Sequence, residues 1–246
     1  MSVFQIHIDT QTLGELRDVV NEDLNISYSV RYGDHRAWDK ICAIMDRLDD
    51  TVNYLNELKL NTGKFTRSAF DFFDFMNNAS VIDECISQLA KIFKVSEKNF
   101  QNSTAIFRQP GNDGKGTDTR YFKYLRSLCS VHPVETSYYR NTYQANDFEC
   151  SPYVMWNNNR LSFDDNSDLT VVVYTSKDDD SFKKIQIHIS QIFDFVKARV
   201  VFINEVTAAI EQYQKQEILR LKNKPIKKEA EFENYTSYLI NLNEEL

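Results

Sequence analysis

Arg126 and His132 stand six positions apart in the segment 120–140, and their types and spacing are the best indication of chemistry in the sequence. The imidazole of a histidine titrates near neutrality, so it can take a proton from a ribose 2'-hydroxyl or give one to a leaving oxygen. A guanidinium can hold a phosphate in a two-pronged fork and stabilise the charge that develops on it. The pair therefore predicts cleavage of RNA without a metal ion or another cofactor.

Basic residues near Arg126 and His132 in the sequence are candidates to bind the RNA backbone. Residues 108–126 include five basic side chains and two aspartates, although the whole chain has a net charge of -7. That net charge argues against indiscriminate binding of nucleic acid, but it leaves room for local attraction of a phosphate. We predict that Arg120, Lys123 and Arg140 bind RNA. A second basic block at 215–228 is better explained as a solvated helix face.

The segment that must position the pair is predicted as a helix over 119–131, with Thr119 as its N-cap. Pro133 interrupts the helix and biases His132 away from helical angles. Residues six apart on an ideal helix differ by roughly 600° and about 9 Å of axial rise, so Arg126 and His132 do not share a face. They can meet through the length of the arginine, through the helix break, or across two subunits.

A symmetric dimer brings two copies of one surface together, which would place two arginines and two histidines at one cleft. We therefore predict a homodimer with residues 120–140 at or beside the two-fold axis. The alternative is that Arg126 pairs with a carboxylate such as Glu135 and that His132 only terminates a helix. Catalysis requires both side chains to be exposed in a shared cleft, whereas the alternative buries one of them in an ion pair.

The rest of the chain predicts a mainly α fold: a helical bundle with a small β-hairpin or sheet insertion. Apolar residues at steps of three and four predict helices, and 6 Gly and 4 Pro are few for 246 residues. The expected helices cover about 36–60, 66–94, 119–131 and 190–222, with a short helix at 12–24 and a hairpin at 170–189. The predicted divisions are an N-terminal strand and short helix at 1–35, the bundle at 36–225 with its insertion at about 150–189, and an acidic C-terminal tail at 226–246.

Two sequence patterns leave room for more than one interpretation. The tetrapeptide Gln-Ile-His-Ile occurs at 5–8 and again at 186–189, which predicts two strands in similar environments that are candidates to pair with each other. A cluster of phenylalanines could stack on bases, but this spacing is more typical of a helical core, where we expect it. The cluster consists of Phe65, Phe70, Phe72, Phe73 and Phe75.

The cysteines and the absence of apolar runs bear on location. Cys42, Cys85, Cys129 and Cys150 are scattered without paired spacing, which is typical of reduced thiols in a cytoplasmic protein and not of a disulfide framework or zinc site. The first residues do not resemble a secretory signal, and no run is long enough to span a bilayer. We therefore expect a cytoplasmic protein that has no metal site and no membrane partner.

Arg126-Ser-Leu-Cys-Ser-Val-His132 resembles the Arg-x(4–6)-His signature of the HEPN superfamily (higher eukaryotes and prokaryotes nucleotide-binding) over about residues 36–222. Many members are metal-independent ribonucleases of toxin–antitoxin, abortive-infection and CRISPR systems, built as helical bundles whose two motif copies meet across a dimer. The resemblance implies catalytic roles for Arg126 and His132, RNA as substrate, and an antitoxin or regulatory partner. Ser127, where a polar amide is common, and Pro133 depart from the pattern.

A function of a different class is also compatible with the sequence. A helical protein without catalytic activity could bind a partner through its helices or through its acidic tail. We therefore carry two hypotheses forward, an endoribonuclease of bacterial toxin or phage-defence type and an interaction or scaffold protein.

Overall fold

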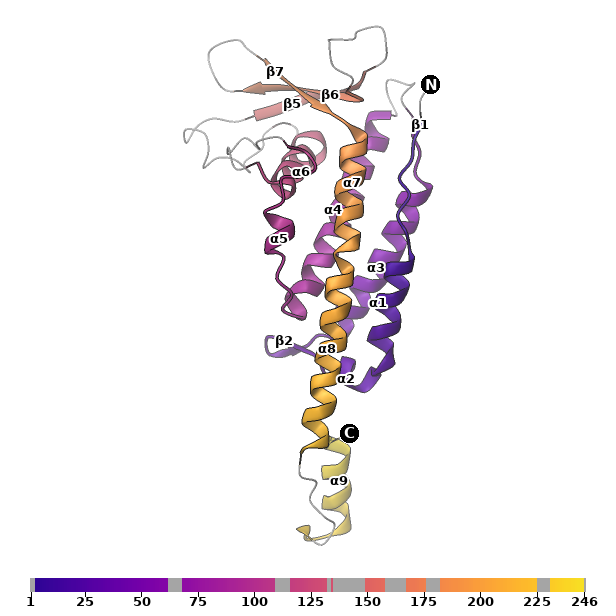
Figure 1. Cartoon of the computed structure of the whole chain (residues 1–246), viewed down its shortest axis with the longest axis vertical. Helices are drawn as coiled ribbons and strands as arrows, with labels where there is room; N and C mark the ends of the chain where they lie inside the picture. Colours follow the sequence, from indigo (N-terminus) through magenta and orange to yellow (C-terminus); the bar gives the residue numbers. More distant parts are fainter. Residues whose placement is uncertain are drawn as a thin grey trace.

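The computed structural model describes residues 3–61, 68–108, 116–131, 134, 149–157, 167–175, 182–224 and 231–245. Within these residues the protein is mainly α-helical and carries small antiparallel sheets, as predicted. The helices form an elongated bundle with a three-stranded sheet at one end and the C-terminal helix at the other (Figure 1). No helix in the described part of the chain has the length and apolar character needed to cross a membrane.

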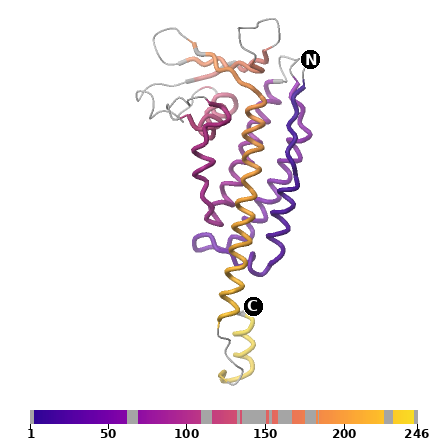
Figure 2. The backbone as a smooth tube through the Cα atoms, in the orientation of Figure 1, coloured from indigo at the N-terminus to yellow at the C-terminus, as the bar shows by residue number. Residues whose placement is uncertain are grey.

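The helices follow the apolar stripes of the sequence. They are α1 (Gln11–Glu22), α2 (Leu24–Ser29), α3 (Trp38–Glu57), α4 (Ser68–Ile92), α5 (Lys98–Gln101), α6 (Asp118–Arg126), the π-helix η1 (Ser127–Val131), α7 (Ile189–Val201), α8 (Ile203–Lys222) and α9 (Tyr235–Glu245). The single helix expected at 190–222 is divided into α7 and α8 at Phe202. The N–H of Phe202 still donates to the carbonyl of Ala198, so the two helices follow nearly one line (Figure 2).

The predicted hairpin at 170–189 is present and belongs to a larger sheet. The strands are β1 (Val3–Phe4), β2 (Arg31–Tyr32), β3 (His35–Arg36), β4 (Leu60–Asn61), β5 (Glu149–Trp156), β6 (Leu169–Thr175) and β7 (Phe182–Ile187). Strands β6 and β7 pair antiparallel with Val172 opposite Lys184, and β5 lies along the other edge of β6. Residues 169–173 of β6 are all buried, and the sheet lies across one end of the bundle (Figure 1).

The proposed pairing of the two Gln-Ile-His-Ile segments is wrong. Strand β1 pairs with β4, with Phe4 opposite Leu60, and β7 pairs with β6. The N–H of Ile8 donates to Asn56 Oδ1 at 2.7 Å, and Asn56 Nδ2 donates to the carbonyl of Ile8 at 2.9 Å. The Asn56 side chain of α3 thus forms the hydrogen bonds that a neighbouring strand would otherwise form with the N–H and carbonyl of Ile8. The Ile8 side chain is buried in the core.

The N-terminal segment packs into the same core as the long helices. Gln214 of α8 donates from Nε2 to the carbonyl of Val19 at 2.8 Å and to Ser27 Oγ at 3.1 Å, which connects α8 to α1 and α2. Gln214 is also the last buried residue of α8. The final two turns of α8 therefore extend beyond the bundle, toward α9 (Figure 2).

Arg199 of α7 is the largest buried charged side chain among the described residues, with 1% of its surface exposed. Its Nε lies 2.8 Å from Asp83 Oδ1 of α4, and its Nη2 pairs with Glu97, the N-cap of α5, and donates to Ser87 Oγ at 2.7 Å. The Nε contact lacks the angle of a good hydrogen bond, so its attraction is mainly Coulombic. These contacts join α4, α5 and α7 at one buried point.

Replacement of Arg199 by alanine should lower the free energy of unfolding by about 3–5 kcal/mol, because it leaves Asp83 and Glu97 without their cation in a buried position. Urea denaturation followed by circular dichroism measures this change. Arg220→Ala is the control, because its pair with Glu217 is on the surface and should contribute about 0.5 kcal/mol or less. Equal effects of the two substitutions would contradict the role assigned to Arg199.

Candidate functional site

Arg126 ends α6, and the structure places it beside two of the predicted RNA-binding residues. Arg120, Lys123 and Arg126 recur every three residues, so each is a neighbour of the next on the helix surface and the three span a broad side of roughly 120°. Arg120 is exposed, whereas Lys123 and Arg126 are partly buried. The opposite side is apolar and packs into the bundle, since Tyr121, Phe122, Tyr124 and Leu125 are all buried. His132 and Arg140 lie outside the described residues.

The guanidinium of Arg126 has an unusual environment. Its Nε is buried and has no hydrogen-bond partner in the described part of the protein. Within those same residues, no carboxylate forms an ion pair with Arg126, and Glu135, the partner considered from the sequence, lies outside them. A donor that loses water without gaining a partner costs free energy, and more so when it carries charge. The site therefore favours an anion at this guanidinium.

Two buried contacts fix the position of α6. Asp118 accepts from the N–H of Phe107 at 2.9 Å and from Ser103 Oγ at 2.6 Å, so the start of the helix is tied to the preceding turn. Phe122 stacks on Phe195 of α7 with ring centroids 4.4 Å apart. The basic side of α6 is thereby held outward by a rigid connection to the bundle.

The helix expected over 119–131 differs from the prediction at both ends. Thr117 is the N-cap instead of Thr119, because the Thr117 side chain accepts from the N–H of Arg120 and Asp118 already begins the helix. After Arg126 the chain changes to a π-helical turn, whose hydrogen bonds run from i to i+5. Such turns are rare and are frequent at functional sites. Pro133, which has no N–H to donate, follows closely in the sequence and disfavours a regular α-helical end.

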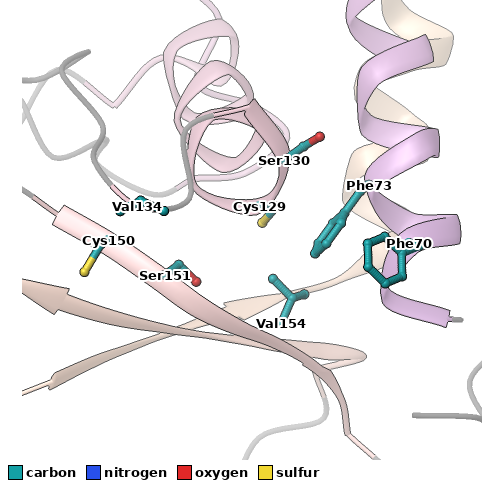
Figure 3. A pocket seen from close by; sticks show the side chains of 8 residues that line it. All are labelled: Phe70, Phe73, Cys129, Ser130, Val134, Cys150, Ser151 and Val154. Atoms are coloured by element: carbon teal, nitrogen blue, oxygen red, sulfur yellow. The ribbon is translucent and has the colours of Figure 1, made fainter. Parts of the chain in front are cut away.

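A cavity of about 520 Å³ lies beside the π-helical turn. Its walls come from the start of α4, from the π-helical turn and from β5 (Figure 3). The described residues that line it are Phe70, Phe73, Cys129, Ser130, Val134, Cys150, Ser151 and Val154. None of these carries a charge, and the two serine hydroxyls are the strongest hydrogen-bonding groups among them.

The sequence signal for this cavity was the phenylalanine cluster, which we had assigned to the core. Phe72 and Phe75 are buried as predicted, but Phe70 is 67% exposed, so the core assignment is wrong for this residue. Phe70 lies at the first turn of α4 and contacts Phe73 edge to face, with ring centroids 5.7 Å apart. Both side chains belong to the cavity wall (Figure 3). Phe65 lies outside the described residues.

Cys129 is the chemically quiet cysteine of the site. All four cysteines of the chain are free, and two of them, Cys129 and Cys150, line different walls of the cavity. Burial raises the pKa of the Cys129 thiol far above its usual range, which keeps it protonated at neutral pH. Across the described residues, no group of three or more His, Cys, Asp or Glu side chains could hold a metal ion.

Comparison of the chain with protein-family models, with curated proteins and with solved structures gives no match. The chemistry of the site therefore follows from its own residues. These are a row of cations along α6, a partly buried arginine without a described partner, and an uncharged cavity that begins one turn after it.

Thiol alkylation at about pH 8 should modify Cys42 and Cys150 before Cys85 and Cys129. Burial raises the pKa of Cys85 to about 11 and raises that of Cys129 further, so both hold little reactive thiolate below pH 9 or so. Mass spectrometry of peptides after timed exposure to iodoacetamide measures the order. All four should react alike in guanidinium chloride, and early labelling of Cys129 in the native protein would contradict its burial.

Proposed function

We propose that this protein is a metal-independent endoribonuclease of bacterial toxin or phage-defence type, with Arg126 and His132 as its catalytic residues. The observation that carries the proposal is the partly buried guanidinium of Arg126, whose Nε lacks a partner among the described residues. An RNA phosphate would satisfy this donor through a charge-assisted hydrogen bond. The resemblance of the segment 126–132 to the HEPN signature supports the same assignment.

The chemistry assigns one step to each side chain. His132 takes the proton of a ribose 2'-hydroxyl, and the resulting oxygen attacks the adjacent phosphorus while the bond to the 5'-oxygen breaks. The 5'-oxygen leaves with a proton from an imidazolium, which gives a 2',3'-cyclic phosphate and a free 5'-hydroxyl. Arg126 holds the non-bridging oxygens and stabilises their charge in the transition state. Arg120, Lys123 and Arg140 attract the flanking phosphates.

A homodimer would supply a base and an acid at the same cleft, since each chain contributes one His132. We place residues 120–140 at or beside the two-fold axis, because a symmetric interface would bring both copies of Arg126 and His132 to one cleft. A bacterial cytoplasm is the proposed location, and four free cysteines agree with a reducing compartment. An antitoxin or regulatory protein is the proposed partner, because uncontrolled RNA cleavage would harm the cell.

Arg126→Ala and His132→Ala should each reduce cleavage of labelled total RNA by about 100-fold or more, with EDTA present throughout. Arg126→Lys should remain well below wild type, because an ammonium cannot replace the planar fork on a phosphate. Lys215→Ala, which removes an exposed cation on α8, is the matched control and should cleave normally. Wild-type activity in both alanine variants, or complete loss of wild-type activity in EDTA, would refute the assignment.

If the active site is shared by two chains, the cleavage rate should rise with nearly the square of the protein concentration. This holds at protein concentrations below the dissociation constant of the dimer. Light scattering on the same samples gives the mass. A monomer that still cleaves RNA with first-order dependence on protein would exclude the shared site, although it would leave the roles of Arg126 and His132 open to the test above.

The interaction protein remains the second candidate, and one observation favours it. Apolar side chains are exposed at the end of α8 and on α9, away from the cationic side of α6; they are Leu219, Leu221, Tyr235, Leu239 and Ile240. Exposed apolar groups of this kind are common at protein interfaces. Absence of any RNA cleavage by the wild-type protein, with normal folding, would favour this second function.

A further inference from the structure

Part of the cavity wall follows Arg126 closely along the chain. Cys129 and Ser130 form one of its walls and follow Arg126 by three and four residues on the same helical stretch. Residues at this spacing are neighbours on a helix surface. A nucleotide whose phosphate binds Arg126 would therefore have the cavity wall about one helical turn away.

The lining favours a flat, uncharged ligand. A volume of about 520 Å³ is within the range of small-molecule pockets, and Phe70, Phe73 and Val154 supply apolar walls. A charged group would lose its hydration there without finding a counter-charge in the described lining. The hydroxyl of Ser130, which is partly exposed, can donate or accept a hydrogen bond, so it fits the polar edge of a heterocycle.

We propose that the cavity binds one unpaired nucleobase of the RNA, next to the phosphate held by Arg126. This inference rests on the proposed function and adds the form of its substrate. Phe70 would stack on the base, which explains why a large aromatic side chain stands 67% exposed at the cavity wall. Aromatic side chains hold unpaired bases by stacking, which tolerates differences in sequence.

The charges of the two surfaces indicate which part of the nucleotide each of them binds. The phosphate stays with the cations of α6, and the base enters the uncharged cavity between α4, the π-helical turn and β5 (Figure 3). A base in a duplex cannot do this without leaving its stack, so single-stranded RNA is the expected substrate class. Since serine hydroxyls act as both donors and acceptors, the preference among the four bases should be small.

The test uses the full-length protein and a short single-stranded RNA that carries 2'-O-methyl groups, which cannot be cleaved by 2'-hydroxyl attack. Fluorescence anisotropy measures its affinity for wild type and for Phe70→Ala, which should bind about tenfold more weakly. Phe182→Ala is the matched control, because Phe182 is also an exposed aromatic residue, on β7, and does not line the cavity. Val154→Phe fills the cavity from the opposite wall and should weaken binding to a similar extent.

A second RNA with one abasic position tests whether Phe70 contributes to the affinity by contacting a base. Wild type should bind it about as weakly as Phe70→Ala binds the intact RNA, and Phe70→Ala should lose little more. Equal affinity of wild type and Phe70→Ala for the intact RNA, with both correctly folded by circular dichroism, overturns the base site. So does the absence of RNA binding by wild type.

The same measurements separate this inference from the proposed function. Tight binding that depends on Phe70, together with no cleavage of unmodified RNA, would retain the base site and reject the nuclease. Cleavage that depends on Arg126 and His132 but is unaffected in KM by Phe70→Ala would retain the nuclease and reject the base site.

Discussion

The fold depends on one buried cation. The loss of hydration of a buried guanidinium must be compensated by contacts on several sides. Arg199 forms ion pairs with Asp83 on α4 and with Glu97 at the start of α5. Its guanidinium also lies over the rings of Phe100 and Phe202. These groups can surround it only if α4, α5 and α7 keep one arrangement. After α5 the chain reaches Phe107, whose N–H donates to Asp118 at the start of α6, so the Arg199 cluster and α6 are joined by a short anchored segment.

The long helices were predictable because their apolar stripes are continuous. α3 and α4 lie within two residues or so of the predicted bounds at most ends, since burial repeats every turn along both. The division at Phe202 was not predictable, because the apolar pattern passes through it unbroken. Nor was the end of β1, because whether Ile8 joins a strand depends on Asn56, an ordinary polar residue 48 positions later.

The candidate site also has one part that the sequence could predict and one that it could not. The spacing of Arg120, Lys123 and Arg126 is a local property, so the sequence was enough to place all three on one helix. The cavity is a non-local property, because α4, the π-helical turn and β5 meet only in the folded chain. Phe70 shows what the sequence could not predict. Its spacing is that of a core residue, but its side chain lines a cavity and does not pack against another helix.

The point at which α8 leaves the bundle has a consequence for local stability. Beyond Gln214 no described residue of α8 is fully buried, so the last two turns gain little free energy from packing against the core. A short helix without such support is marginal in water and opens independently of the whole protein. The last two turns of α8 are therefore expected to open separately from the core, where a protease could cut them, while the bundle and the cationic side of α6 stay intact.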